Sequence, residues 1–186
     1  MPFIKTAIPD LLVFEPKVFG DDRGYFFESY NFNTFSADGI TMQFIQDNQA
    51  RSCYGVVRGL HYQLSPYAQT KLIRALEGTI LDVVVDMRVG SPAYGKVFTI
   101  ELSAENKKQL LVPQGFAHGY SVLSDTAEVM YKCDNFYNKA AEGGVLYNDP
   151  SLQIDWKIPA GKMILSDKDL ILPMFADSKH NFVYQP

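Results

Sequence analysis

A chain of 186 residues, 47% apolar and 13% aromatic, is long enough to bury one substantial core and too short for two ordinary domains. Its formal net charge of −4 excludes the broad basic field that draws proteins to nucleic acid or to anionic membranes. No segment has the length of a membrane span, and the N-terminus lacks the basic and apolar pattern of a secretory signal. We therefore expect one domain, residues 1–186, in a cytoplasmic protein without nucleic-acid or membrane partners.

Short alternating apolar runs, separated by Gly, Pro, Asn and Asp, predict β-strands along most of the chain. The exception comes first, at residues 31–38, where Asn31 or Asn33 can cap a short helix and Gly39 can end it. Strands are expected in the runs rich in β-branched and aromatic residues, which are 72–87, 96–102, 109–112, 119–123 and 128–136. Turn residues at 77–78, 88–95 and 103–107 interrupt them.

The stretch that begins at Trp156 is expected to form an irregular tail that wraps the domain. Many strands without a parallel βαβ rhythm predict a sandwich or a barrel. The two cysteines, Cys53 and Cys133, have no C-x-x-C spacing, and we expect two separate reduced thiols. Of the three histidines, His180 lies near the terminus and is expected in solvent.

The other two histidines stand in motifs. His61 lies in the run G-V-V-R-G-L-H-Y-Q, where strand alternation puts it on one face with Gly59 and Gln63. His118 closes the run P-Q-G-F-A-H. The spacings G-x5-H and P-x-G-x2-H resemble the two motifs of the cupin superfamily. That resemblance implies an all-β, cupin-type double-stranded β-helix, a jelly-roll barrel with a few short helices and its site inside the barrel.

The chain departs from the metal-binding cupin pattern, which usually presents H-x-H and a Glu in the first motif. Gln63 stands where the second His would be, and His61 and His118 would need a carboxylate that the spacing does not offer. Zinc and iron sites require three or four ligands in fixed geometry. We therefore expect no metal and no cofactor, and a metal-dependent dioxygenase or isomerase is the weaker interpretation.

A longer set of signatures spans almost the whole chain and closely resembles the dTDP-4-dehydrorhamnose 3,5-epimerase family, part of the cupin superfamily. The signatures are F-G-D-D-R-G-Y-F-F-E at 19–28, Q-D-N at 46–48, R-G-L-H-Y-Q at 58–63, Lys71, D-V-V-V-D-M-R at 82–88, P-Q-G-F-A-H-G at 113–119, Tyr131, Tyr137, E-G-G at 142–144, D-P at 149–150 and S-D-K-D at 166–169.

The resemblance implies conversion of dTDP-4-dehydro-6-deoxy-D-glucose to dTDP-4-dehydro-L-rhamnose. Protons at C3 and C5 flank the C4 carbonyl, so removal of either gives an enolate that can be reprotonated on the opposite face. Two inversions need a base that titrates near neutral pH and an acid across the ring. His61 is the natural base. The resemblance implies that an Asp near the C-terminus is its partner, which we place at Asp169, with Asp167 as the alternative.

Alternation groups Tyr131 with Val129 and Cys133 on the expected inward face, where its phenol can serve as the acid. Lys71 shares its face with apolar neighbours and not with Arg74, so its ammonium is expected inside the barrel. An inward ammonium is costly unless it has a partner or a task. Beside the C4 oxygen it would stabilise the enolate.

Substrate binding needs groups for a diphosphate and a base. Arg23 and Arg58 can form bidentate contacts with phosphate oxygens, and Tyr137 offers a flat face to thymine. His118 is expected to assist at the C4 oxygen or to orient Lys71. By resemblance, the nucleotide and sugar are also held by Glu28, Gln46, Asn48, Glu142 and Lys168.

The resemblance also implies a homodimer in which the N-terminal strands of one subunit pair with, or complete, the sheet of its partner. Two other functions remain open. One is a related enzyme on another nucleotide sugar, either a mono-epimerase or a 3,4-ketoisomerase. The other is a non-catalytic cupin that binds a nucleotide sugar. Each site residue also has an ordinary structural role available, such as a hydrogen-bonded core histidine for His61, and only the joint pattern favours catalysis.

Overall fold

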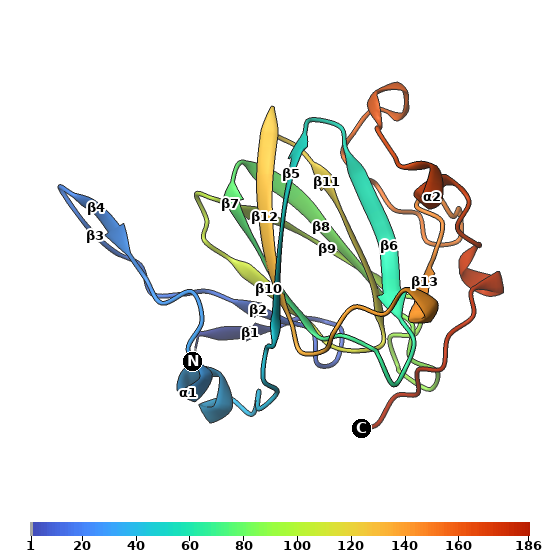
Figure 1. Ribbon diagram of the computed structural model, residues 1–186, viewed down its shortest axis with the longest axis horizontal. Coiled ribbons are helices and arrows are strands. Elements are labelled where there is room, and N and C mark those ends of the chain that lie inside the picture. Colours follow the sequence, from blue (N-terminus) through green and yellow to red (C-terminus); the bar gives the residue numbers. More distant parts are fainter. Residues whose placement is uncertain (1) are drawn as a thin grey trace.

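The computed structural model describes residues 2–186 and consists mainly of two antiparallel sheets that face each other (Figure 1). One sheet has six strands in the order β1-β2-β10-β7-β12-β5, and the other has five in the order β13-β6-β11-β8-β9. Apart from the pairs β1–β2 and β8–β9, neighbouring strands in each sheet are not consecutive along the chain, as in a jelly roll. The strands β3 and β4 form a separate hairpin that extends away from the two sheets (Figure 1). The predicted all-β, jelly-roll class is confirmed.

The helices and strands have the following bounds: β1 (Phe3–Lys5), β2 (Leu12–Phe14), β3 (Phe19–Asp21), β4 (Gly24–Phe26), α1 (Phe32–Ala37), β5 (Gln46–Cys53), β6 (Val57–Gln63), β7 (Lys71–Glu77), β8 (Thr79–Asp86), β9 (Val97–Ser103), β10 (Gln109–Val112), β11 (Phe116–Val122), β12 (Thr126–Cys133), β13 (Glu142–Gly144) and α2 (Asp167–Leu170), with 3-10 turns η1 (Lys139–Ala141), η2 (Ala160–Lys162) and η3 (Phe175–Asp177).

The strand predictions agree closely with these bounds. The run 72–87 forms β7 and β8, which turn at Gly78, where a positive φ of 70° suits glycine. The run 119–123 is the second half of β11, and the run 128–136 ends three residues early, at Cys133. In the predicted helix, now α1, the side chain of Asn31 accepts a hydrogen bond from the Asn33 amide. The cap prediction is confirmed for Asn31.

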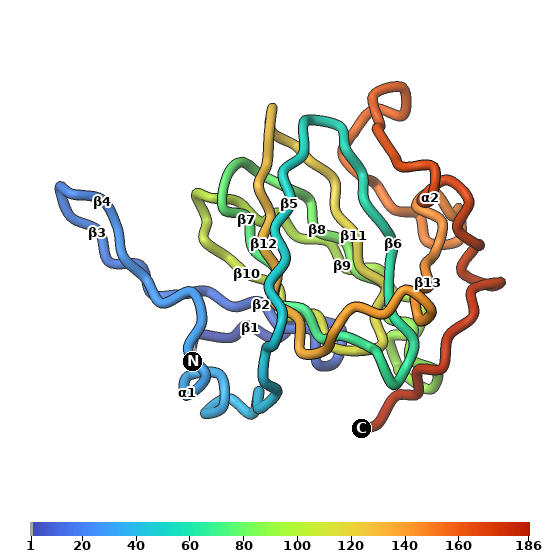
Figure 2. The backbone as a smooth tube through the Cα atoms, in the orientation of Figure 1, coloured from blue at the N-terminus to red at the C-terminus, as the bar shows by residue number. Residues whose placement is uncertain are grey.

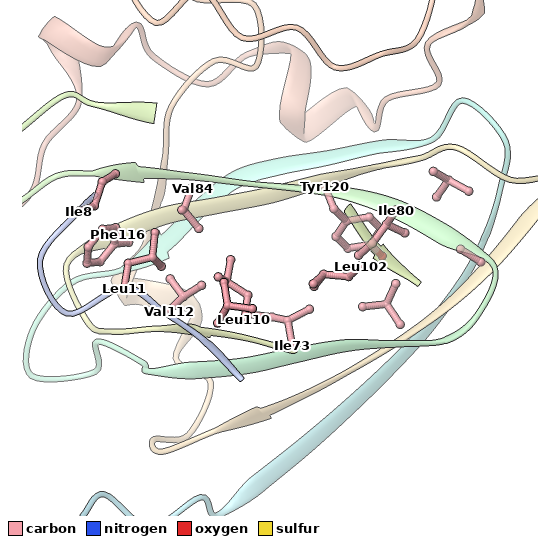
Figure 3. Packing of buried hydrophobic residues seen from close by; sticks show 14 of the residues in the cluster. Ile8, Leu11, Ile73, Ile80, Val84, Leu102, Leu110, Val112, Phe116 and Tyr120 are labelled. Carbon is pink, nitrogen blue, oxygen red and sulfur yellow. The ribbon is translucent and has the colours of Figure 1, made fainter. Parts of the chain in front are cut away.

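The main core lies between the two sheets, where apolar side chains from both sheets meet (Figure 3). Ile73 of β7 and Leu110 of β10 project from one sheet, and Val84 of β8 and Leu102 of β9 project from the other. A second cluster joins the outer face of the five-stranded sheet to the C-terminal tail, and it includes Trp156. The tail therefore wraps the domain as predicted.

The C-terminal tail is fixed to the start of β6 by main-chain hydrogen bonds. The Val57 amide donates to Ile164 O at 2.9 Å, and the Ile164 amide donates to Gly55 O at 2.8 Å. Figure 2 shows the tail running beside β6 before it reaches the C-terminus. This attachment brings α2 against β6, and β6 carries His61.

Three smaller expectations can be compared with the structure. Cys53 is exposed and Cys133 is buried, and both are free thiols, as predicted. The prediction that His180 lies in solvent is wrong, because its ring is half-buried and stacks on Phe182 with centroids 5.8 Å apart. Phe182, two residues further along the tail, packs against the His180 ring. Within residues 2–186, the structure contains no helix long and apolar enough to cross a membrane.

Strands β6 and β11 lie very close together at Gly59. A Cβ atom at this position would lie 2.6 Å from His118 O and 2.7 Å from the Gly119 Cα, and the φ of Gly59 is +109°. The pairing of the two strands shifts register here, between His118 and Tyr120. Only glycine fits both the space and the backbone conformation.

We predict that Gly59→Ala lowers the free energy of unfolding by about 1–3 kcal/mol or more, because the methyl group must displace backbone atoms. Gly161→Ala is the control, since a Cβ there meets nothing within 4 Å. Denaturant titration of both variants measures the change in unfolding free energy from the shift in midpoint, provided that the m-value is unchanged. Equal midpoints for the two variants would contradict the steric argument.

Candidate active site

The cavity that holds most of the predicted catalytic residues lies between the two sheets and has a volume of about 300 Å³. Its walls come from both sheets and from α2. A second hollow continues from it towards the η1 turn and shares His61, Lys71 and Tyr131 with it. The first part is lined by Ala50, Arg58, His61, Lys71, His118, Gly119, Tyr120, Tyr131, Ser166, Lys168 and Asp169.

His61 and Asp169 form a close pair although they are far apart in the sequence. His61 Nε2 lies 2.6 Å from Asp169 Oδ1, and the Asp169 side chain is only 4% exposed. The Gly59 amide donates to Asp169 Oδ2 at 3.5 Å, and the Asp169 amide donates to the Ser166 hydroxyl at 3.2 Å. Burial acts to raise the pKa of Asp169, but the hydrogen bond and charge of His61 outweigh it and hold this pKa below its ordinary value. An ionised Asp169 fixes the imidazole tautomer. Asp167, the alternative, is exposed.

A second His–Asp pair lies beside the first. His118 Nε2 lies 3.0 Å from both carboxylate oxygens of Asp82, and the Asp82 side chain is fully buried. In the pairing of β6 with β11, His118 stands directly opposite His61. Asp82 was not among the predicted site residues, although it begins the motif at 82–88. An acidic residue inside the apolar run L-D-V-V-V is the signal that could have identified it, because a buried carboxylate needs a partner.

Lys71 begins β7 and stands opposite Cys133 of the neighbouring strand β12. Within residues 2–186, no carboxylate lies close enough to form an ion pair with its ammonium. Burial lowers the pKa of Lys71, while the charge of the Asp82 carboxylate partly opposes this. Burial also raises the pKa of Cys133 to about 11, so the thiol stays neutral at physiological pH. The Lys71 side chain lines the cavity, where a desolvated ammonium interacts strongly with a developing negative charge.

Tyr131 projects from β12 into the same cavity and packs against the core between the sheets. Its neighbours on that face are Val129 and Cys133, both buried, as alternation predicted. Burial raises the pKa of Tyr131, so its phenol keeps its proton well above neutral pH. Tyr131 comes from the six-stranded sheet and His61 from the five-stranded sheet.

Arg58 reaches the same cavity as His61, which strict strand alternation would not allow for residues three apart. The register shift at Gly59 explains this, because it turns the strand between them. The Arg58 guanidinium donates to the Ser52 hydroxyl through Nε at 3.3 Å and through Nη2 at 3.1 Å. No carboxylate within residues 2–186 pairs with it, so its remaining donors are available to an anion.

The second hollow is lined by the predicted binding residues Gln46, Asn48, Tyr137 and Glu142. Glu142 links the two hollows, because its carboxylate accepts a hydrogen bond of 2.6 Å from Lys168, which lines the first hollow. Tyr137 lies near the same carboxylate in this hollow. Burial acts to raise the pKa of Glu142, but Lys168 and Tyr137 outweigh it and lower this pKa.

Two predicted binding residues are not brought to the cavity by their own chain. Arg23 lies at the tip of the β3–β4 hairpin, its side chain is 90% exposed, and it pairs with Asp21 at 2.5 Å. Glu28 follows the hairpin and accepts a hydrogen bond from the Asn31 side chain at 3.1 Å. Figure 1 shows the hairpin pointing away from the two sheets.

Within residues 2–186, no three His, Cys, Asp or Glu side chains gather in a way that could hold a metal ion. Both cavity histidines instead contact one carboxylate each, Asp169 for His61 and Asp82 for His118. Hydrogen-bonded His–Asp pairs, a buried ammonium and a protonated phenol around one cavity suit proton transfer beside a carbonyl group.

Comparisons with known proteins agree with this geometry. The family model described as dTDP-4-dehydrorhamnose 3,5-epimerase matches residues 5–177. A dTDP-4-dehydrorhamnose 3,5-epimerase from Shigella flexneri is 54% identical over 181 residues, which cover 97% of this chain and 99% of the relative.

Solved structures agree as well. The crystal structure of a dTDP-4-dehydrorhamnose 3,5-epimerase from Elizabethkingia anophelis superimposes with a TM-score of 0.90 at 53% identity, over 94% of this chain and 96% of that one. A dTDP-6-deoxy-D-glucose-3,5-epimerase from Legionella pneumophila, solved in complex with dTDP-4-keto-L-rhamnose, has a TM-score of 0.90 at 44% identity, over 94% and 93% of the two chains.

The jelly-roll fold and the proton-transfer groups inside it define the chain as a cupin-type isomerase, a carbohydrate epimerase. More narrowly, the chain belongs to the dTDP-4-dehydrorhamnose 3,5-epimerase family.

We predict that Asp169→Asn lowers kcat by about 10²–10⁴-fold, because the amide cannot stabilise the imidazolium that forms when His61 takes a proton. Asp167→Asn, two residues away on the exposed side of α2, should leave kcat and KM near their wild-type values. Steady-state kinetics of the two matched variants decide between the two carboxylates. A larger loss of kcat in Asp167→Asn than in Asp169→Asn would show that Asp169 is not the functional partner of His61.

Proposed function

We propose that the chain converts dTDP-4-dehydro-6-deoxy-D-glucose to dTDP-4-dehydro-L-rhamnose by metal-free proton transfer at C3 and C5. His61 is the base, Asp169 holds and stabilises it, Tyr131 is the acid and Lys71 stabilises the enolate. The observation that carries this proposal is the placement of His61 and Tyr131 on facing sheets around one cavity. A base and an acid on opposite walls can act on opposite faces of a ring held between them.

Each inversion is one cycle of proton removal and return. His61 takes the proton from C3 or C5, and the electron pair of the broken C–H bond moves into the enolate, placing negative charge on the C4 oxygen. The ammonium of Lys71 stabilises that charge, and His118, held by Asp82, assists at the same oxygen. Tyr131 then gives its proton to the carbon from the other face. Solvent returns a proton to Tyr131 and removes one from His61, so each cycle exchanges one carbon-bound hydrogen.

The nucleotide is held beside the groups that act on the sugar. Arg58 and Lys168 line the first hollow and offer positive charge to a diphosphate. Tyr137 is 56% exposed at the mouth and offers its ring to the base. Gln46, Asn48 and Glu142 line the second hollow and supply hydrogen-bonding groups for the nucleotide and sugar. The choice of thymidine is supported by the family and not by any group unique to thymine.

We further propose a homodimer in which the β3–β4 hairpin of one subunit reaches the cavity of its partner. Three aromatic side chains on this hairpin are exposed, Phe19 at 54%, Tyr25 at 62% and Phe26 at 68%, which is costly unless a second chain covers them. This arrangement supplies Arg23 and Glu28 to the binding site from the partner subunit and covers a two-stranded ribbon that is marginal alone.

Two broader proposals accompany these. Residues 1–186 form a single domain, supported by a core to which both sheets contribute and by a family match over residues 5–177. A cytoplasmic location is supported by two free cysteines, which suit a reducing compartment.

The reaction is tested by NMR of the chelator-treated protein with dTDP-4-dehydro-6-deoxy-D-glucose in deuterated water. We expect deuterium at both C3 and C5, lost in His61→Ala because no base remains. Tyr131→Phe should retain exchange but slow inversion by about 10²-fold or more, since it removes only the acid.

The alternatives give different spectra. Exchange at one position only would indicate a mono-epimerase, and movement of the keto group to C3 would indicate a 3,4-ketoisomerase. Binding of the nucleotide sugar without any exchange would overturn the catalytic proposal and favour a binding protein.

The shared site is tested by mixing two impaired variants, Arg23→Ala and His61→Ala, after unfolding and refolding them together. If Arg23 acts in the partner's cavity, each mixed dimer has one intact site, so about a quarter of wild-type sites should recover at equal mixing. If Arg23 acts within its own chain, mixed dimers have no intact site and the activity stays at the average of the two variants. Size-exclusion chromatography confirms that the mixed species are dimers.

A further inference from the structure

Three glutamines converge on one short loop at the mouth of the cavity. The loop, residues 135–138, follows β12 and precedes η1, and we call it the rim loop. Phe136 and Tyr137 of the rim loop are 63% and 56% exposed. The glutamines come from separate places, Gln46 from β5, Gln63 from β6 and Gln69 from the segment before β7.

Each glutamine bonds to the backbone of the rim loop and not to its side chains. Gln69 Nε2 donates to Asn135 O at 2.7 Å, and Gln63 Nε2 donates to Phe136 O at 3.2 Å. The Tyr137 amide donates to Gln46 Oε1 at 3.2 Å, and the Asn138 amide donates to Gln63 Oε1 at 2.7 Å. Glutamine side chains therefore bond to the backbone of four successive residues, and we call the three glutamines the glutamine clasp.

Gln63 is the centre of the glutamine clasp. It is 6% exposed, and both ends of its amide are used, because Nε2 also donates to Tyr67 O at 2.7 Å. It lies two residues from His61 on the same strand and lines the same hollow. Partial disruption of a buried amide with three hydrogen bonds is costly, because the groups left unpaired stay buried. Gln63 thus links the strand of the base to the loop that carries Tyr137.

The rim loop in turn connects to the rest of the site. Tyr137 and Glu142 line the same hollow, and Glu142 accepts a hydrogen bond from Lys168, the residue before Asp169. A shift of the rim loop would therefore move the phenol away from the carboxylate that joins the two hollows. We propose that Gln63, supported by Gln46 and Gln69, is a positioning residue that fixes Tyr137 at the cavity mouth for binding the nucleoside diphosphate of the substrate.

This inference rests on the proposed function only for the identity of the nucleotide, so binding of dTDP itself is the measurement. Calorimetry of wild type, Gln63→Glu, Tyr137→Ala and the double variant forms a double-mutant cycle. Gln63→Glu keeps the acceptor for the Asn138 amide but turns a carboxylate oxygen towards two carbonyl oxygens, Tyr67 O and Phe136 O. We expect its Kd for dTDP to rise about tenfold, with almost no further rise when Tyr137 is already Ala.

A positioning role also predicts a pH dependence that a general loss of stability would not give. At low pH the introduced carboxyl becomes protonated and regains one donor, and its burial beside carbonyl oxygens raises its pKa into a measurable range. The ratio of variant to wild-type affinity should therefore recover as the pH falls from about 8 to about 5. Gln185→Glu, the same change at an exposed glutamine, should match wild type at every pH.

Additive effects in the cycle together with a flat pH ratio would overturn the inference. If Gln63→Glu does not fold, Gln69→Leu takes its place, because it removes the hydrogen bond to Asn135 O. Gln69→Leu must then raise the Kd for dTDP in the wild-type background but not in the Tyr137→Ala background. If the wild-type protein binds dTDP but exchanges no sugar protons, the proposed reaction is refuted. The double-mutant cycle still tests the positioning role of Gln63, because it measures binding alone. Wild-type protein that does not bind dTDP would overturn both.

Discussion

Two sheets that face each other across one cavity impose the geometry on which the site depends. Side chains that alternate along each strand point either into the space between the sheets or away from it. Most of this space is filled by apolar core, and the cavity occupies the remaining part. His61 and Tyr131 therefore lie on opposite walls of the cavity, because their strands belong to opposite sheets. In the proposed reaction, the inversion at the sugar ring follows from this layered arrangement.

Burial makes the chemistry of this cavity effective and also makes it costly. Lys71 is desolvated and has no ion pair among the described residues 2–186, burial keeps Tyr131 protonated, and the carboxylates of Asp82 and Asp169 are buried against histidines. Each of these groups opposes folding unless it is paired, since a buried charge loses its hydration. The surrounding apolar strands compensate. Their packing leaves the polar groups few alternative positions, so they need little reorganisation when charge develops.

Strand alternation predicted a sandwich or barrel and the inward positions of Tyr131 and Lys71, and the resemblance to the cupin motifs implied the jelly roll. Three features were beyond sequence reasoning, each for a physical reason. Arg58 joins His61 because of a register shift that periodicity does not encode. The choice of Asp169 over Asp167 as the neighbour of His61 depends on a four-residue helix whose orientation is set by tertiary contacts. The buried pairing of Asp82 with His118 requires the strand order, because β8 and β11 are distant in the sequence.

The origin of Asp169 in the C-terminal tail has a consequence for how the protein matures. The strands of both sheets lie before residue 145, and the tail covers the outer apolar face of the five-stranded sheet. A ribosome releases the N-terminal part first. A chain that has not yet delivered its last fifth thus has a complete set of strands, an uncovered apolar face and a His61 without its carboxylate. Protein quality control can recognise such an intermediate by its exposed apolar face.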